Sequence, residues 1–455
     1  MYGLCFSNPS TVPPAVNRLG WSLASKGWGT PVEAEERKQG FSALPFNWTE
    51  KERVAAPSSA APSSAGAMVI MGSSSGSLVL PMGDDMHTHL RQGELMDAVV
   101  PLLRKGGCNR VLVMPNTVPP IVTCSQALEY RNELLKRPSR LLQDPKVDYL
   151  MTLYLCPDVD PQDLVNNAKA SHVVGVKLYP RGVTTNSQHG VEDLGAFDSV
   201  FEVLQQCGLT LHIHAESPKA TALKAEETFL PAFEQIHQRF PGLKIVFEHI
   251  STAAAVEAVK GKKNVAATIT AHHLRLTTGD VWGQEEAEES LNHLPDGPEE
   301  RRVLNPHNFC KPVPKREEDR QALLSVIREG NPQFFLGSDS APHPVTKKNS
   351  NPPAAGVFTQ AFLLAYLADT FARAGCLDKL RGFACEHAAA FFGMPKKELV
   401  EGEDCVVLER KPFAVPQAVC GMEGSGNEVV PFLSGDELLF TVSVTPFSAA
   451  LESIQ

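Results

Sequence analysis

The chain has 455 residues, 43% of them hydrophobic and 21% charged, a composition that excludes a collagen, a disulfide scaffold or a wholly disordered chain. Its net charge of -10 argues against a nucleic-acid binder, because phosphate binding needs clustered positive charge. No uninterrupted apolar run reaches the roughly 18 residues that a membrane span needs. The ten cysteines form no CxxC pair, which favours reduced, intracellular thiols.

Residues 1–78 are predicted to form a disordered N-terminal extension. The first 30 residues contain no Asp or Glu, and residues 55–66 are almost entirely Ala, Pro and Ser. Such stretches bury too little apolar surface to offset the entropy lost on ordering. An acid-free start is also typical of organelle transit peptides. We therefore expect a cytoplasmic protein, or an organellar one if the extension is a transit peptide.

Residues 79–402 show short apolar runs that alternate with helical patterns. Helices are predicted over 124–136, 193–207, 226–240 and 317–330. The predicted strands end near His89, Asn116, Leu155, Tyr179, His214, His249, Thr270 and Asp339. Eight such units favour an α/β fold, a (β/α)8 TIM barrel of the metal-dependent hydrolase type. An open doubly wound sheet is the alternative, although no phosphate-binding glycine motif follows an early strand.

The rest of the chain is expected to extend and cover this barrel. Two further helices are predicted over 356–374 and 378–393. Residues 403–455 are predicted to form a small C-terminal cap, with β-like segments at 405–408 and 438–444. The acidic stretch 283–304 is predicted to be an insertion in the barrel that forms a solvated loop near the barrel mouth.

Polar side chains follow several of the predicted apolar strands. In the segment 85–91, His87 and His89 are two residues apart and share one face of a strand. The other polar residues that follow strands are Lys177, His212, His214, His249 and Asp339. The carboxyl ends of barrel strands meet at one mouth, so this set predicts a metal site there. The pattern alone does not choose between His212 and His214.

The lysine in this set has a specific chemical use. Burial favours a neutral amine. A neutral amine can add carbon dioxide, and the resulting carbamate is an anionic, bidentate group that can bridge two metal ions. A salt-bridged core lysine is the alternative for Lys177 considered by itself.

At this point the motifs resemble those of the amidohydrolase superfamily, and within it the single-function dihydroorotases of fungi and many bacteria. The resemblance covers residues 80 to 445. It is carried by the segments 85–91, 114–116, 177–187, 247–249, 308–312 and 337–344, which follow one another in the family's order.

The resemblance implies a binuclear zinc centre with two Zn²⁺ per subunit, bridged by a carbamylated lysine and a hydroxide. His87, His89, Lys177 (as N6-carboxylysine) and Asp339 would hold the more buried ion. Lys177, His214 and His249 would hold the second. His212 is then left out of the metal set, and His272 and His273 are interpreted as supporting or structural residues.

The resemblance also implies how a substrate is held. Asp339 would be the catalytic acid and base. Arg91, Asn116 and His343 would bind a free carboxylate, for which an arginine offers a bidentate fork. The hydroxyls of Thr184 and Thr185 would close over the substrate. Backbone groups at Lys311, Ala355 and Gly356 would contact the ring amide.

The activity implied is dihydroorotase, the reversible cyclisation of N-carbamoyl-L-aspartate to L-dihydroorotate and water, the third step of de novo pyrimidine biosynthesis. Such an enzyme would bind its small-molecule substrate and neither nucleic acid nor a membrane. A homodimer is compatible with the family. Two alternatives stay open. One is another cyclic amidohydrolase, such as a dihydropyrimidinase or an allantoinase, which would not need a carboxylate clamp. The other is a noncatalytic scaffold of the same fold.

Overall fold

A computed structural model describes residues 77–136, 147–283, 303–419 and 428–454. The predicted N-terminal extension, apart from residues 77 and 78, lies outside this range, as does most of the acidic insertion. Within the described range, no helix is both long enough and apolar enough to cross a membrane.

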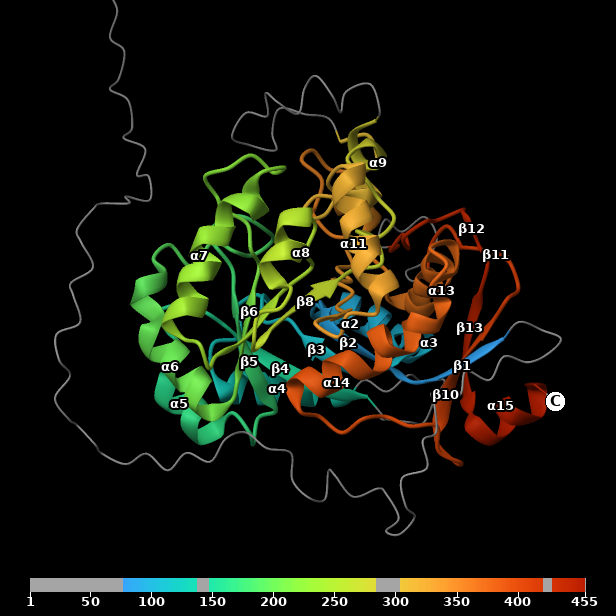
Figure 1. Cartoon of the computed structure of the whole chain (residues 1–455), viewed down its shortest axis with the longest axis horizontal. Helices are drawn as coiled ribbons and strands as arrows, with labels where there is room; N and C mark the ends of the chain where they lie inside the picture. Colours follow the sequence, from blue (N-terminus) through green and yellow to red (C-terminus); the bar gives the residue numbers. More distant parts are fainter. Residues whose placement is uncertain (1–76, 137–146, 284–302, 420–427, 455) are drawn as a thin grey trace, which may run out of the picture. The chain divides into compact units, whose positions relative to one another are not determined.

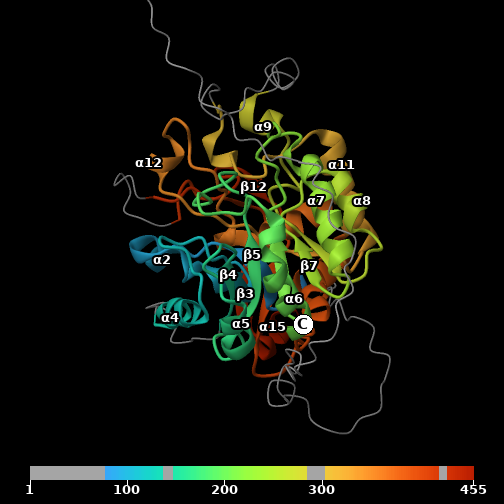
Figure 2. The same ribbon diagram turned by 90° about the vertical axis from the view of Figure 1, so that its left-hand side faces the viewer.

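The core of the fold is an eight-stranded sheet in which every strand pairs in parallel with the next strand along the chain (Figures 1 and 2). Its strands are β2 (Gly83–Thr88), β3 (Cys108–Val113), β4 (Asp148–Tyr154), β5 (Val173–Leu178), β6 (Thr210–Ile213), β7 (Lys244–Phe247), β8 (Val265–Ile269) and β9 (Phe334–Leu336). A parallel bridge between Thr88 and Ser340 joins the ends of the first and last strands. The predicted TIM barrel is therefore confirmed, and each strand ends close to the predicted residue.

Helices connect the strands and lie on the outside of the sheet (Figures 1 and 2). The α-helices up to β9 are α2 (Gly93–Val99), α3 (Leu102–Lys105), α4 (Cys124–Leu135), α5 (Pro161–Asn167), α6 (Asp198–Cys207), α7 (Ala225–Arg239), α8 (Ala253–Val259), α9 (Gly279–Trp282) and α11 (Glu317–Glu329). The 3-10 helix η1 (Leu194–Phe197) precedes α6, and η4 (Pro306–Asn308) precedes α11. Local sequence explains where such helices begin. At α4, the Thr123 hydroxyl accepts from the Gln126 backbone N–H, and the Gln126 side chain accepts from the Thr123 backbone N–H.

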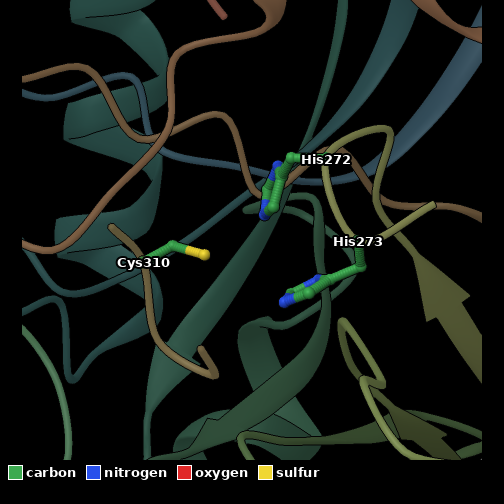
Figure 3. A group of neighbouring side chains, drawn as sticks. All are labelled: His272, His273 and Cys310. Carbon is green, nitrogen blue, oxygen red and sulfur yellow. The ribbon is translucent and has the colours of Figure 1, made fainter. Parts of the chain in front are cut away.

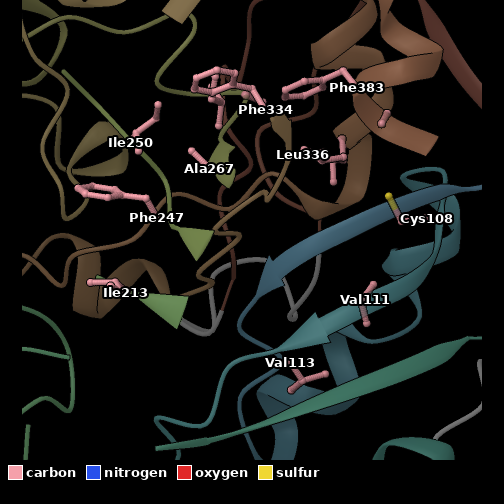
Figure 4. Close-up of a cluster of buried hydrophobic side chains, with 14 of the residues drawn as sticks. Cys108, Val111, Val113, Ile213, Phe247, Ile250, Ala267, Phe334, Leu336 and Phe383 are labelled. Carbon is pink, nitrogen blue, oxygen red and sulfur yellow. The ribbon is translucent and has the colours of Figure 1, made fainter. Parts of the chain in front are cut away.

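The hydrophobic core has two layers because strand side chains alternate between two faces. Val111 and Val113 of β3 point outward into the layer between the strands and the helices, together with Phe334 of β9 and Phe383 (Figure 4). Inside the barrel, the intervening side chains pack against the helix α14 (His387–Phe392). This inner cluster includes Met86, Leu112, Met114, Leu150, Val246, Phe335, Ala388 and Ala389. These apolar side chains fill the bottom of the barrel interior, below the polar groups at the mouth, and are called the apolar floor.

The first strand of the described chain joins the C-terminal region and not the barrel. β1 (Leu78–Pro81) pairs antiparallel with β10 (Asp404–Glu409), which pairs with β13 (Thr441–Pro446). The strand predicted over 438–444 is divided into β12 (Glu437–Leu438) and β13. The backbone N–H of Leu439 donates to the Asp369 carboxylate, which diverts the chain between the two strands. β12 pairs with β11 (Phe413–Ala414).

The segment that follows β9 differs from its prediction. The helix expected from residue 356 begins only at η5 (Gln360–Phe362) and continues as α13 (Leu363–Arg373). Before it, Val357 forms a parallel bridge with Ser340, so this backbone belongs to the wall of the barrel mouth. The remaining helices are α12 (Val345–Lys348), η6 (Leu377–Lys379), the π-helical turn η7 (Gly382–Glu386), α14 and α15 (Phe447–Ile454).

Candidate active site

A cavity opens at the carboxyl ends of the barrel strands. It is lined by His87, His89, Arg91, Asn116, Tyr179, Thr184, Thr185, His214, His249, Lys311, Asp339, Ala341, Ala355 and Gly356. Among the site residues predicted from the sequence, the structure thus brings together all except Lys177 and His343, which stand directly behind this wall. Tyr179 and Ala341 were not predicted.

His87, His89 and Asp339 converge on one side of the cavity. The Nε2 atoms of His87 and His89 are 3.4 Å apart, and they lie 3.2 Å and 3.1 Å from the same carboxylate oxygen of Asp339. Burial lowers the pKa of His89 to about 4, so its imidazole is neutral. Burial alone would raise the pKa of Asp339, but the neighbouring His87 holds it well below its usual range.

The proton on His89 can be placed from its hydrogen bonds. Its Nδ1 lies 2.8 Å from the Asn116 side-chain oxygen, and the Asn116 amide nitrogen donates to the Thr185 carbonyl at 3.2 Å. Nδ1 must therefore carry the proton and donate, which leaves a lone pair on Nε2. That lone pair faces the Asp339 carboxylate, and a bound cation would relieve the repulsion between the two acceptors.

His214 and His249 form the opposite side of the cavity. Their ring centroids are 4.7 Å apart, and the His249 ring lies 5.0 Å from that of His87. Burial holds the pKa of His249 well below its usual range, and its Nδ1 atom has no hydrogen-bond partner among the described residues. The Nε2 atom of His214 lies 2.7 Å from a Glu216 carboxylate oxygen.

The backbone is strained at two of these residues. His249 has a φ of 42° and Asp339 a φ of 44°, a region that side-chain-bearing residues seldom adopt. Arg91, at the rim, has a φ of 60°. Such conformations cost roughly 1–3 kcal/mol each and persist where the surrounding structure imposes them, which is common at functional sites.

Lys177 lies beneath the histidines and is fully buried. Burial holds the pKa of its amine well below the usual range. Its Nζ contacts the carboxylate of Glu248, which is also fully buried. Glu248 was not among the predicted site residues, although it precedes His249 in one of the motifs. Its Oε2 lies 3.0 Å from His87 Nδ1.

His212 lies deeper in the barrel than His214. Its Nδ1 is 3.0 Å from Glu248 Oε1, and its ring stacks on Phe392 of the apolar floor with centroids 5.9 Å apart. It does not line the cavity. The structure therefore separates the two histidines that the pattern alone could not distinguish.

The rim carries a positively charged corner. Arg91 Nε donates to the Pro342 carbonyl at 3.0 Å, and its Nη2 lies 3.1 Å from His343 Nε2. That same nitrogen of His343 lies 3.0 Å from the Ala355 carbonyl oxygen. Burial lowers the pKa of His343 to about 2, so it is neutral and Arg91 supplies the charge.

A loop after β5 closes one side of the cavity. Thr184 and Thr185 lie on it, and Ser187 holds its turn by donating from Oγ to the Thr184 carbonyl at 2.7 Å. The Asn186 side chain donates to the Asn116 carbonyl at 2.9 Å. Asn116 thus connects this loop to His89, a role that sequence reasoning did not assign.

His272, His273 and Cys310 form a second group of metal-binding residue types (Figure 3). Lys311, which follows Cys310, lines the cavity. Both ring nitrogens of His273 are already engaged, 2.9 Å from the Thr270 hydroxyl and 3.0 Å from the Pro312 carbonyl. This leaves fewer free donors than the four of a typical structural zinc site. This count favours the interpretation of both histidines as supporting residues, which stays a prediction.

The donors at the barrel mouth fit a divalent metal. Two groups of ligand atoms meet there among the described residues, and within each group the atoms lie within 4.8 Å of one another. The first group comes from His87, His89 and Asp339, and the second from His87, Glu248 and His249. Neutral imidazoles and carboxylates are the ligands that zinc prefers alongside thiolates. Their burial over an apolar floor limits access to the open side of the cavity.

Comparisons with known proteins show what this chain resembles. Residues 156–296 match the family model named amidohydrolase. The chain is 44% identical over 360 residues to a probable dihydroorotase of Schizosaccharomyces pombe, covering 78% of this chain and 96% of the relative. It is 38% identical over 383 residues to the dihydroorotase of Saccharomyces cerevisiae, covering 80% and 97%.

Solved structures give the same result. The crystal structure of Saccharomyces cerevisiae dihydroorotase in complex with 5-fluoroorotic acid has a TM-score of 0.71 and 35% identity, covering 81% of this chain and 99% of that one. An L-hydantoinase from Arthrobacter aurescens has a TM-score of 0.62 at 18% identity, covering 81% and 84%, and so shares the fold.

Proposed function

The chain belongs to the dihydroorotase family of amidohydrolases, and from this premise we propose that its barrel-mouth cavity interconverts N-carbamoyl-L-aspartate and L-dihydroorotate in pyrimidine biosynthesis. The observation that carries the proposal is the convergence of His87, His89 and Asp339 opposite His214 and His249, next to Arg91. A metal centre and an anion-binding group then flank one small space.

The metal centre in this proposal contains two zinc ions. His87, His89, Asp339 and a carbamylated Lys177 would hold one of them, and Lys177, His214 and His249 the other. Bound zinc supplies Lewis acidity, which lowers the pKa of a water molecule and polarises a carbonyl group. The low proton affinity of the buried Lys177 amine supports carbamylation, because only the neutral amine adds carbon dioxide.

Asp339 moves the proton in this proposal. In ring opening, its carboxylate accepts a proton from the attacking water and delivers it to the ring nitrogen as the amide bond breaks. In ring closure the transfer runs in reverse: as the ureido nitrogen bonds to the side-chain carboxyl carbon, Asp339 accepts the proton that this nitrogen loses and delivers it to the carboxyl oxygen that leaves as water. The depressed pKa of Asp339 supports its starting ring opening as the base.

The free carboxylate of the substrate is assigned to the charged corner. Arg91 would bind it with the help of Asn116 and His343, while Thr184 and Thr185 would cover the substrate from the loop after β5. Backbone groups of Lys311, Ala355 and Gly356 would meet the ring amide. A half-buried arginine fork suits a planar carboxylate because both can form two parallel hydrogen bonds.

The test is an assay of both reaction directions with metal content measured on the same sample. We expect turnover of dihydroorotate and of carbamoyl-aspartate, with close to two zinc ions per chain. Turnover of dihydropyrimidines without turnover of dihydroorotate would replace the proposal by a sibling cyclic amidohydrolase. Absence of both metal and turnover would leave a noncatalytic scaffold.

Two further assignments belong to the same proposal. We expect a small-molecule enzyme of the cytoplasm that forms a homodimer. Sedimentation of the full chain would measure its assembly, and microscopy of the tagged full chain would reveal an organellar location if residues 1–78 act as a transit peptide.

A further inference from the structure

Lys348 is a buried lysine behind the wall of the cavity, at the end of α12. Its side chain is only 3% exposed. Its Nζ donates to three backbone carbonyls, those of Phe309 at 3.0 Å, Ala354 at 2.9 Å and Gly356 at 2.6 Å. Among the described residues it forms no ion pair. Its hydrogen bonds are thus directed at the backbone of two loops, and burial lowers its pKa to about 7.

These two loops are the ones that carry the backbone part of the cavity wall. One runs through Phe309 to Lys311, and the other from Ala354 to Gly356. The Gly356 N–H also donates to the Phe309 carbonyl at 2.9 Å, which joins the loops directly. Lys348 binds both partners of that contact and so fixes the two loops relative to each other.

The second loop is held from both sides. The carbonyls of Ala354 and Gly356 face Lys348, while the carbonyl between them, that of Ala355, lies 3.0 Å from His343 Nε2. Gly356 has a φ of 150°, and a Cβ there would lie 2.5 Å from the Ala341 carbonyl oxygen. The backbone at Gly356 is therefore packed closely against Ala341 on one side and hydrogen-bonded to Lys348 on the other, which restricts its position.

We propose that Lys348 is a positioning residue that sets substrate affinity. It would do so by holding the backbone at Lys311, Ala355 and Gly356 at a fixed position relative to the side chains of Arg91 and His343. This inference rests on the proposed function, in which those backbone groups contact the substrate. Lys348 itself does not line the cavity and touches no reacting atom. The contacts it organises are made in the bound substrate and in the transition state alike.

Loss of contacts that substrate and transition state share raises KM and leaves kcat nearly unchanged. Lys348→Met keeps the length of the side chain but removes all three donors. We expect its KM for dihydroorotate to rise at least about 10-fold with kcat within about threefold of wild type. Lys348→Gln retains two N–H donors and should give an intermediate KM.

Lys347→Met is the matched control, because Lys347 is exposed and is the neighbouring residue on the same helix. We expect wild-type KM and kcat for it. Metal content and Tm are measured for every variant, and kinetics are run at a fixed interval below each Tm. Wild-type metal content in Lys348→Met would localise the defect to the substrate side of the cavity.

The possible outcomes distinguish a failure of the proposed function from a failure of the role assigned to Lys348. If the wild-type protein fails to turn over dihydroorotate, the proposed function fails whatever Lys348 does. If wild type is active and Lys348→Met has an unchanged KM, the positioning role is refuted. Parallel loss of kcat and metal, or failure of both Lys348 variants to fold, would assign Lys348 to stability and equally overturn the inference.

Discussion

Replacing Lys177 by alanine should destabilise the metal-free protein by about 1–3 kcal/mol, because it leaves the buried carboxylate of Glu248 without the amine that contacts it. Glu248 and Lys177 are both fully buried and in contact. Without the lysine, the remaining partners of Glu248 among the described residues are His87 and His212, each about 3.0 Å away. Both histidines have pKa values lowered by burial, so neither brings a positive charge to Glu248.

A second substitution, Glu248→Gln, should restore part of the stability lost in Lys177→Ala. In the double variant Lys177→Ala with Glu248→Gln, the unpaired charge is replaced by a neutral amide. We expect the double variant to be more stable than Lys177→Ala by about 1–3 kcal/mol, the cost of an unsatisfied buried polar group. The cavity left by the lysine side chain is common to both variants and cancels in the comparison.

The measurement is urea unfolding followed by circular dichroism at pH 7 with a chelator present. Lys263→Ala, at an exposed lysine, is the control and should change the free energy of unfolding by less than about 0.5 kcal/mol. A double variant no more stable than Lys177→Ala would show that the Glu248 carboxylate does not depend on contact with the Lys177 amine, and would refute this prediction.

Three predictions concern the metal and the substrate. Lys177→Ala should lose metal and activity together and regain part of both with added propionate; zinc content and rate equal to wild type would refute the carbamate. Asn116→Ala should lower metal affinity about 10–100-fold, since the amide orients His89, and a chelator titration that matches wild type would contradict this. Arg91→Lys should raise KM for dihydroorotate about 10-fold or more, because an ammonium cannot form the paired hydrogen bonds of a guanidinium, and an unchanged KM would place the carboxylate elsewhere.

The sequence predicted most of the fold because each barrel strand carries a local signal. β7 reads as a short apolar run that ends in Glu248 and His249, and β9 as one that ends before Asp339. The regions that differed from prediction are those where tertiary contacts override local pattern. Leu439 would continue a strand, but its N–H is taken by Asp369, which comes from a distant helix.

The same limit explains which site residues were missed. His87 and His89 were found because a two-residue spacing fixes their common face. Glu248 stands in a motif, but only the barrel interior reveals that it meets Lys177 and His212 from two other strands. Lys348 had no sequence signal, since an ordinary lysine on a short helix is expected to face solvent.

The polar cluster can exist in this interior because the apolar floor and the strained mouth act together. Phe392 and the inner side chains close the barrel below His212, so Lys177 and Glu248 have no water to solvate them and must satisfy each other. Above them, the left-handed backbone at His249 and Asp339 turns these two side chains toward the cavity at the points where their strands end. A barrel with a polar floor would let water reach the Lys177 amine, and its proton affinity would return to the ordinary range. The chemistry proposed for the mouth therefore depends on hydrophobic residues that never touch the substrate.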